Sequence, residues 1–257
     1  MAGRAVAMQR QRELGNYRRR HRGRFLLTLG VLGGALATGI FCLMHPGSGS
    51  IFAGGTGGPG KDNPADAYTK LADWPLTLVS EAHPLPEDFT VRTEQVENNQ
   101  RFDAQAVAQL RAMLADGRAA GMRLQVCSGY RSVNRQQQLY AEQVVTERDR
   151  GYDEVEALAV AKTKVALPGS SEHNLGLAAD IVAEDYQKLD AGFDATPECQ
   201  WLMAHCAEYG FILRYPKDKT AITGIQYEPW HYRYVGTDAA AEIQRQGVCL
   251  EEYLQGR

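Results

Sequence analysis

The chain has 257 residues, 44% of them hydrophobic and 23% charged, which suits a globular protein and excludes disordered and collagen-like classes. The net charge of -3 conceals an asymmetry, because residues 1–24 hold eight arginines and a single acid. Residues 45–257 therefore hold 20 basic and 30 acidic residues. This length allows one large domain or two small ones.

The first predicted element is a membrane-spanning helix at residues 25–44. This stretch of twenty residues has no charge, and as a helix it would span about 30 Å, the thickness of a bilayer core. The arginines before it predict a basic cytoplasmic tail at 1–24 and an exported C-terminal part. A cleaved signal peptide is the main alternative, since Ala35-Leu36-Ala37 resembles a cleavage site, but the apolar stretch is long for one.

The segment 45–70 is rich in Gly, Ser and Pro and is predicted to be a flexible linker. We expect one domain at 71–257, without internal repeats. Hydrophobic spacing and turn residues predict helices at 103–121, 134–150, 154–167, 196–210 and 239–246, and strands at 123–127, 177–182, 211–215 and 225–235. We expect Asp103 and Thr196 to cap their helices. Helices and strands mixed without a regular βαβ order favour the α+β class.

Three short segments carry residues suited to catalysis: CSGYRS at 127–132, SEHNLGLAAD at 171–180 and EPWHYRYVG at 228–236. His173 precedes Asp180 by seven residues, with a glycine between them that allows a sharp turn. His173, Asp180 and His231 would supply three zinc ligands and leave a fourth position for water, as in catalytic zinc sites. Glu228 would then serve as a general base.

Spacing alone leaves simpler interpretations open. A single histidine is more often a satisfied polar residue than a ligand, and the H-E-x-x-H signature of many zinc peptidases is absent. By itself, an arginine such as Arg131 is more often a surface or salt-bridge residue than a catalytic one. Trp230 and Tyr215 could be core aromatics. The four cysteines after residue 44 could be buried free thiols as readily as disulfides.

The three segments together resemble the VanY-type D-alanyl-D-alanine carboxypeptidases, a group of zinc peptidases. Residues 171–180 match the SxHxxGxAxD motif of this group at every defined position, and 228–231 match its second, ExxH-type motif. Residues 128–132 match its SGYRS segment, with Gln136 and Leu139 following. The resemblance covers about residues 71–254.

The resemblance implies that His173, Asp180 and His231 bind zinc, that Glu228 is the general base and that Arg131 steadies developing negative charge. It also implies a small antiparallel sheet flanked by helices, with the metal in a groove. Candidate substrate-binding residues are Ser128, Gln136, Ser171, Tyr215 and Trp230.

The expected reaction is removal of the C-terminal D-alanine from peptidoglycan stem peptides by a membrane-anchored, extracellular domain of a bacterial cell. L,D-carboxypeptidase or D-Ala-D-Ala dipeptidase activity remains an alternative, because pocket depth decides the substrate and a sequence does not show it. An endopeptidase and a non-catalytic cell-wall binding module are further alternatives. We expect no nucleic-acid partner, and a monomer.

Overall fold

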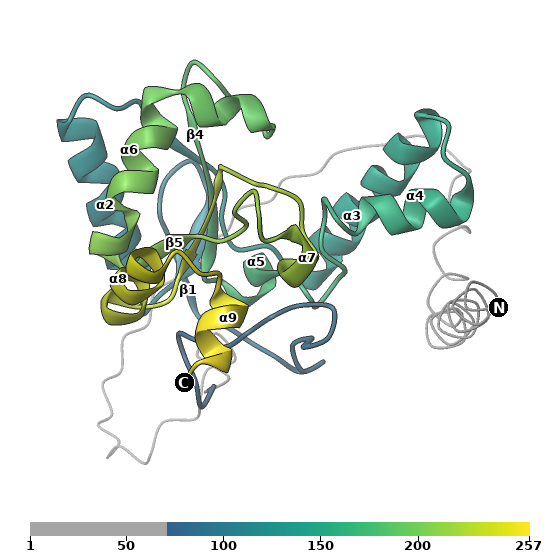
Figure 1. Cartoon of the computed structure of the whole chain (residues 1–257), viewed down its shortest axis with the longest axis horizontal. Coiled ribbons are helices and arrows are strands. Elements are labelled where there is room, and N and C mark those ends of the chain that lie inside the picture. The colour runs from purple at the N-terminus through teal and green to yellow at the C-terminus, as the bar shows by residue number, and fades with distance from the viewer. Residues whose placement is uncertain (1–70) are drawn as a thin grey trace, which may run out of the picture. The chain divides into compact units, whose positions relative to one another are not determined.

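The computed structural model describes residues 71–257, so the predicted tail, membrane anchor and linker lie outside the described residues. Within 71–257, no helix has the length and hydropathy needed to cross a bilayer. In chain order, the elements of this part are β1 Thr93–Gln95, β2 Arg101–Asp103, α2 Val107–Ala119, β3 Leu124–Ser128, α3 Val133–Asp149, α4 Glu154–Ala161, α5 Glu172–Leu175, β4 Ala178–Ala183, the 3-10 helix Ala191–Ala195, α6 Pro197–His205, the 3-10 helix Cys206–Tyr209, β5 Phe211–Leu213, α7 Thr220–Thr223, β6 His231–Tyr234, α8 Thr237–Gln246 and α9 Leu250–Gln255. The predicted α+β class is confirmed (Figure 1).

The central sheet has four strands in the order β3-β4-β6-β5, and every neighbouring pair is antiparallel. Asp180 on β4 lies opposite His231 on β6, and the same register places Ala179 opposite Tyr232. Because successive side chains of a strand point to opposite faces, Asp180 and His231 share one face of the sheet. Tyr232 points to the other face, where it joins the main core.

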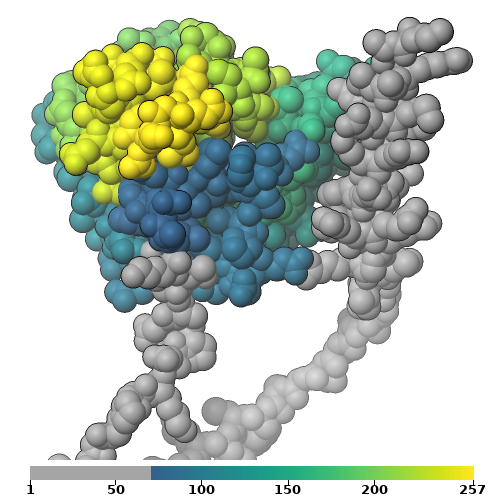
Figure 2. Space-filling model, turned by 60° about the horizontal axis from the view of Figure 1, so that its bottom comes forward, coloured from purple at the N-terminus to yellow at the C-terminus, as the bar shows by residue number. Residues whose placement is uncertain are grey.

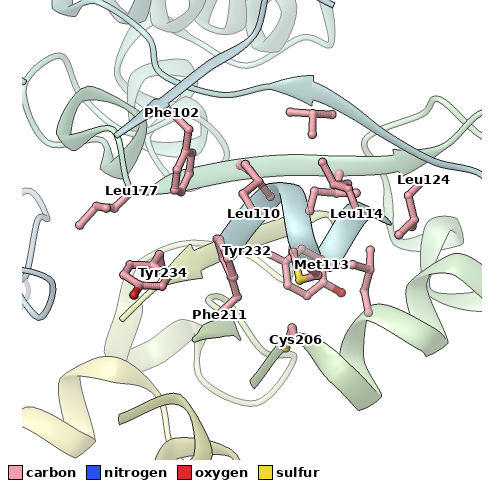
Figure 3. Close-up of a cluster of buried hydrophobic side chains, with 14 of the residues drawn as sticks. Phe102, Leu110, Met113, Leu114, Leu124, Leu177, Cys206, Phe211, Tyr232 and Tyr234 are labelled. Carbon is pink, nitrogen blue, oxygen red and sulfur yellow. The ribbon is translucent and has the colours of Figure 1, made fainter. Parts of the chain in front are cut away.

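The main hydrophobic core lies between that second face and the helices α2 and α6 (Figures 1 and 3). Val107, Leu110 and Leu114 of α2 are buried, as their helical spacing predicts, and Met113 joins them. Each such side chain stabilises the fold by about 1.5–3 kcal/mol when it leaves water. The core therefore fixes β4 and β6, the two strands that carry the predicted ligands.

Two predicted element boundaries on the N-terminal side of the ligand motif are wrong. Asp103 does not cap α2, which begins at Val107 without a side-chain cap. Its Oδ1 instead accepts a hydrogen bond from the backbone of Gln105, and its Oδ2 accepts one from Trp74. The helix predicted at 154–167 ends at Ala161, because the carbonyls beyond it accept tertiary hydrogen bonds from Gln226 and Gln136.

The strand predicted at 225–235 is reduced to β6, His231–Tyr234, and residues 225–230 form a loop. Pro229 lacks the backbone donor that a strand needs, so the chain pairs with β4 only after it. Thr196 caps α6 as predicted, with its hydroxyl accepting from the backbone of Cys199 at 3.2 Å. Four cysteines lie in the described part, and all are free thiols there: Cys127, Cys199, Cys206 and Cys249.

The two ends of the described chain pack together. Leu76 and Leu78 contact a second buried cluster that includes Leu250 of α9 and Val235, which follows β6. Figure 2 shows these parts, blue and yellow, side by side on one face. On the side of the sheet away from α2 and α6, the helices α3 and α4 pack against each other and project as a pair (Figure 1). The helix α9 and the β1–β2 hairpin were not predicted.

Candidate metal and catalytic site

The three predicted metal ligands meet at one buried point. The side chains of His173, Asp180 and His231 each place one ligand atom within 4.8 Å of the others. His173 comes from α5, whose short turn ends at Gly176 in the left-handed conformation, with a φ of 87°. Glycine adopts this conformation without strain, so the chain can reverse and send Asp180 back along β4.

The ring of His173 is oriented by the loop after β3. Its Nδ1 lies 2.6 Å from the carbonyl oxygen of Gly129, which can only accept, so the proton resides on Nδ1. Nε2 is buried without a hydrogen-bond partner and lies 3.3 Å from Asp180 Oδ2. Burial, together with the charge of Arg131, lowers the pKa of His173 to about 4. The ring of His173 is therefore neutral, and the lone pair on its Nε2 faces the cluster and is free to bind a metal.

The ring of His231 faces the cluster with its Nδ1, whereas the ring of His173 faces it with its Nε2. Its Nδ1 lies 3.1 Å from Asp180 Oδ1, while its Nε2 lies 3.4 Å from Glu172 Oε2. Although burial lowers the pKa of His231, its hydrogen bonds to Asp180 and Glu172 outweigh burial and raise it to about 9. Likewise, burial raises the pKa of Asp180, but the two histidines hold it below its usual value.

This donor set fits a zinc ion. Two imidazole nitrogens and one carboxylate are zinc ligands, and ligand atoms about 2.0–2.1 Å from a tetrahedral ion lie roughly 3.3 Å apart. His231 Nδ1 lies 3.1 Å from Oδ1 of Asp180 and His173 Nε2 lies 3.3 Å from its Oδ2, so each nitrogen is near that spacing from one carboxylate oxygen, and one ligand atom from each residue lies within 4.8 Å of the others. The unpartnered Nε2 of His173 is what such a site requires, because a buried polar atom without a partner is otherwise costly.

Glu228 lies beside this cluster, at the end of the loop that leads into β6. Its Oε2 is 3.6 Å from His231 Nδ1, and its side chain is 11% exposed. Burial raises the pKa of Glu228 to about 8, although the charges of His231 and Arg131 oppose the shift. A carboxyl group with a pKa near neutrality can both accept and donate a proton at working pH.

Arg131 reaches the cluster from the loop between β3 and α3. Its Nη2 is 3.7 Å from Asp180 Oδ2, and its Nε is buried without a hydrogen-bond partner. The loop is fixed by two hydrogen bonds to α5, from Arg131 N to His173 O and from Asn174 Nδ2 to Arg131 O. The guanidinium of Arg131 is therefore held near the cluster, and its Nε still has a hydrogen bond to donate.

The predicted substrate-binding residues divide into two groups. Tyr215 lies against the cluster, with its ring centroid 4.8 Å from that of His231, and Trp230 is half-buried in the chain between Glu228 and His231. Ser128 is half-buried on β3 opposite Asp180. Ser171 and Gln136 already hold the fold together, since Ser171 Oγ caps α5 and Gln136 Nε2 donates to Ala166 O.

The groove that was predicted around the metal stays a prediction. Two hollows of about 450 Å³ and 540 Å³ lie away from the cluster, the first beside the end of α3 and the second beside β3.

Sequence reasoning missed the residues that surround the cluster. Glu172, Arg214 and Arg233 are almost fully buried and form a network behind His231. Asn174 links the ligand motif to the loop of Arg131, because its Nδ2 donates to Arg131 O, and its Oδ1 accepts from Gly169 N. Glu172 and Asn174 occupy undefined positions of the ligand motif. One signal was available, because Arg233 lies in a short strand between aromatic residues and a charge there must be paired.

Comparison with known proteins identifies relatives over this region. Residues 99–237 match the sequence model of the VanY family, described as D-alanyl-D-alanine carboxypeptidase. A D-alanyl-D-alanine carboxypeptidase of Enterococcus faecalis is 43% identical over 182 residues, which are 71% of this chain and 66% of that enzyme. The match thus spans just under two thirds of that relative, and the family-model match at residues 99–237 includes all three motifs.

Solved structures share the fold. A vancomycin-resistance D,D-pentapeptidase VanY in complex with Zn(II) is 44% identical, with a TM-score of 0.65, and the match covers 70% of this chain and 99% of that one. A VanYB structure in complex with D-alanine-D-alanine is 43% identical, also with a TM-score of 0.65, covering 71% and 98%. The described domain therefore corresponds to nearly the whole of these solved chains.

Proposed function

Because the chain belongs to the VanY family of D-alanyl-D-alanine carboxypeptidases, we propose that it is a zinc-dependent D,D-carboxypeptidase that removes the terminal D-alanine from peptidoglycan stem peptides. The observation that supports this most is the buried cluster of His173, Asp180 and His231, with Glu228 beside it. The similarity to enzymes solved with Zn(II) and with D-alanine-D-alanine supports both the metal and the substrate.

Zinc would be held by His173 Nε2, Asp180 and His231 Nδ1. When bound, it supplies Lewis acidity, which polarises the scissile carbonyl and makes water a nucleophile at neutral pH. The protein's part is to orient these three donors. The Gly129 carbonyl orients the ring of His173 through Nδ1, and Glu172 faces the Nε2 of His231, so that Nδ1 of His231 is left toward the cluster.

Glu228 would move the proton. Its Oε2 accepts a proton as water attacks the carbonyl before the last D-alanine, and later delivers it to the leaving amine. The burial that raises its pKa to about 8 in the metal-free protein favours the protonated form that must donate. A bound cation nearby would lower this pKa and favour the carboxylate that must first accept.

Arg131 would stabilise the negative oxygen that forms during attack. Its unpartnered Nε and its Nη2 supply donors at the edge of the cluster. Loss of one such donor typically costs about 3–4 kcal/mol of transition-state stabilisation. The partly exposed side chains of Arg131 and Glu228 also mark the side from which a peptide can approach.

The test is the identity of the products. The purified full-length chain, loaded with zinc, is incubated with a stem pentapeptide, the corresponding tetrapeptide and free D-Ala-D-Ala, and the products are read by mass spectrometry. We expect loss of one D-alanine from the pentapeptide only. Cleavage mainly of the tetrapeptide would indicate an L,D-carboxypeptidase, cleavage mainly of the dipeptide a dipeptidase, and no cleavage a binding module.

We also propose that residues 25–44 anchor the protein in a bacterial cell membrane, with residues 45–257 outside. The arginines of 1–24 and the uncharged span support this orientation. Protease added to intact, wall-stripped cells should degrade the 45–257 segment. If that segment resists protease until the cells are lysed, the orientation is reversed. Release of a shortened, soluble form would instead indicate a cleaved signal peptide.

A further inference from the structure

A buried ion cluster lies directly behind His231. Glu172 is almost fully buried, and its Oε1 accepts hydrogen bonds from Arg214 Nε and Arg233 Nη1, both at 2.7 Å. Its other oxygen, Oε2, faces His231 Nε2 at 3.4 Å. Glu172 therefore connects two buried arginines to the ring of a proposed metal ligand. The carboxylate of Glu172 faces Nε2 of that ring, whereas Asp180 faces Nδ1.

A histidine that binds a metal through one nitrogen is oriented by the partner of its other nitrogen. We propose that Glu172 is a positioning residue: it holds the proton of His231 on Nε2, aims Nδ1 at the metal position and thereby sets the metal affinity of the site. This inference rests on the proposed role of His231 as a ligand. The corresponding partner of His173 is a backbone carbonyl, which a side-chain substitution does not remove.

The arginines make Glu172 rigid. Arg233 Nη2 donates to the carbonyls of Pro75 and Thr77 at 2.8 Å and 2.9 Å, and its Nε donates to Tyr234 O. Each of the three nitrogens of the Arg233 guanidinium therefore donates a hydrogen bond, and together these bonds hold the guanidinium in one orientation. A carboxylate buried without such partners would instead take up a proton, because desolvation disfavours the charged form. The net pKa of Glu172 is lowered, since the two arginines overcome the effect of burial.

Arg214 extends the cluster to the C-terminal helix. Its Nη1 and Nη2 donate to the two carboxylate oxygens of Glu251 on α9, at 2.9 Å and 2.7 Å. A continuous chain of ion pairs thus runs from Glu251 through Arg214 and Glu172 to His231. The helix α9 lies beyond residue 237, where the match to the family's sequence model ends. The positioning role therefore predicts that a change on α9 weakens metal binding without touching the site.

The experiment compares zinc affinity, measured by competition with a chelator, in the full-length wild type and in Glu172→Gln, Glu172→Asp and Glu251→Gln. A glutamine at 172 can turn its carbonyl oxygen either to the arginines or to His231, but not to both. We expect Glu172→Gln to bind zinc about 10–100-fold more weakly. Glu172→Asp, which keeps the charge, should recover part of the loss, and Glu251→Gln should weaken binding at least about 3-fold.

Glu147 offers a matched control. It is a buried glutamate on α3 that accepts from Lys164 and Arg150, both at 2.8 Å, and none of its contacts belongs to the metal cluster. Glu147→Gln should lower the melting temperature of the metal-free protein while zinc affinity stays within about 2-fold of wild type. A purely structural role for Glu172 would give this same pattern.

The outcomes separate the two proposals. If the wild type binds no zinc, the proposed function fails. If the wild type binds zinc and Glu172→Gln binds it equally well, the positioning role is overturned and the proposed function stands. If Glu172→Gln does not fold, Glu251→Gln decides: weakened affinity supports the role, and unchanged affinity overturns it.

Discussion

The two histidines of the cluster show how environment gives one residue type two different states. His173 faces a carbonyl and the charge of Arg131, and burial keeps it neutral, with its pKa lowered to about 4. His231 lies between the carboxylates of Asp180 and Glu172, which raise its pKa to about 9. The two carboxylates therefore favour a proton on His231, and zinc, which binds a deprotonated nitrogen, has to compete with that proton for Nδ1.

The first prediction is the loss of metal when a ligand is removed. His231→Ala takes away one of three donors, so the variant should bind far less than the roughly one zinc per chain expected of the wild type. Metal content measured by atomic emission checks this. His205→Ala is the control, because His205 is exposed and paired with Glu208 three residues on. Full zinc occupancy in His231→Ala would contradict the ligand assignment.

The second prediction separates the base from the metal. Glu228→Gln keeps the size of the side chain but cannot accept a proton, so zinc should stay bound while kcat falls by at least about 100-fold. Steady-state kinetics with a stem pentapeptide measure the change. Glu208→Gln alters an exposed glutamate that is also three residues from a histidine and should leave kcat unchanged. Near-normal turnover of Glu228→Gln would mean that the base lies elsewhere.

At the scale of elements, the site depends on short connections more than on long helices. Gly129 lies between β3 and α3, where a Cβ atom would come within 2.2 Å of the carbonyl oxygen of Arg101 on β2. That close approach lets Tyr130 N donate to the same carbonyl at 2.6 Å. It also fixes the Gly129 carbonyl that orients His173. A hairpin that the sequence did not reveal thus supports one ligand and the loop of Arg131.

The third prediction concerns this connection. Gly129→Ala forces the loop away from β2, which should destabilise the fold by about 1–3 kcal/mol and also reduce zinc affinity through His173. Chemical unfolding and chelator competition measure the two effects. Gly256→Ala is the matched control, since a Cβ there meets nothing nearer than 3.7 Å. Equal stability of Gly129→Ala and wild type would show that the loop can move without cost.

At the scale of the whole molecule, the net charge of residues 45–257 has the same sign as the terminal carboxylate of the proposed substrate. Residues 45–257 hold ten more acidic than basic residues, yet a stem peptide ends in a carboxylate. Long-range attraction therefore cannot guide the peptide to the site. Recognition must come from local positive charge, which the metal and Arg131 would supply.

The fourth prediction follows from this balance. Amidation of the terminal carboxylate removes the charge that Arg131 and the metal would recognise. Cleavage of a D-Ala-D-Ala peptide should then fall by about 10–1000-fold in kcat/KM, which corresponds to roughly 1.4–4 kcal/mol. Parallel kinetics on the free and amidated peptides check this. Equal rates would indicate an endopeptidase, because its substrate continues past the scissile bond.

The sequence by itself determined the fold class, the amphipathic face of α2, the capped start of α6 and the residues that form the cluster. These depend on local spacing: Gly176 and the seven residues from His173 to Asp180 set one turn and one strand, and a family motif preserves them. The helix ends were less predictable. The carbonyls after Ala161 and the side chain of Asp103 take partners far along the chain, and those partners override local preference.

Only the tertiary structure decided how each ligand is aimed. Which nitrogen of His231 faces the cluster depends on Glu172, and Glu172 is held in turn by arginines 42 and 61 residues away. No periodicity encodes such a network, because its members lie on α5, β6, α9 and the segment after β5. The physical reason is that a buried charge is tolerable only where partners converge, and their convergence exists only once the sheet register and the packing of α9 are fixed.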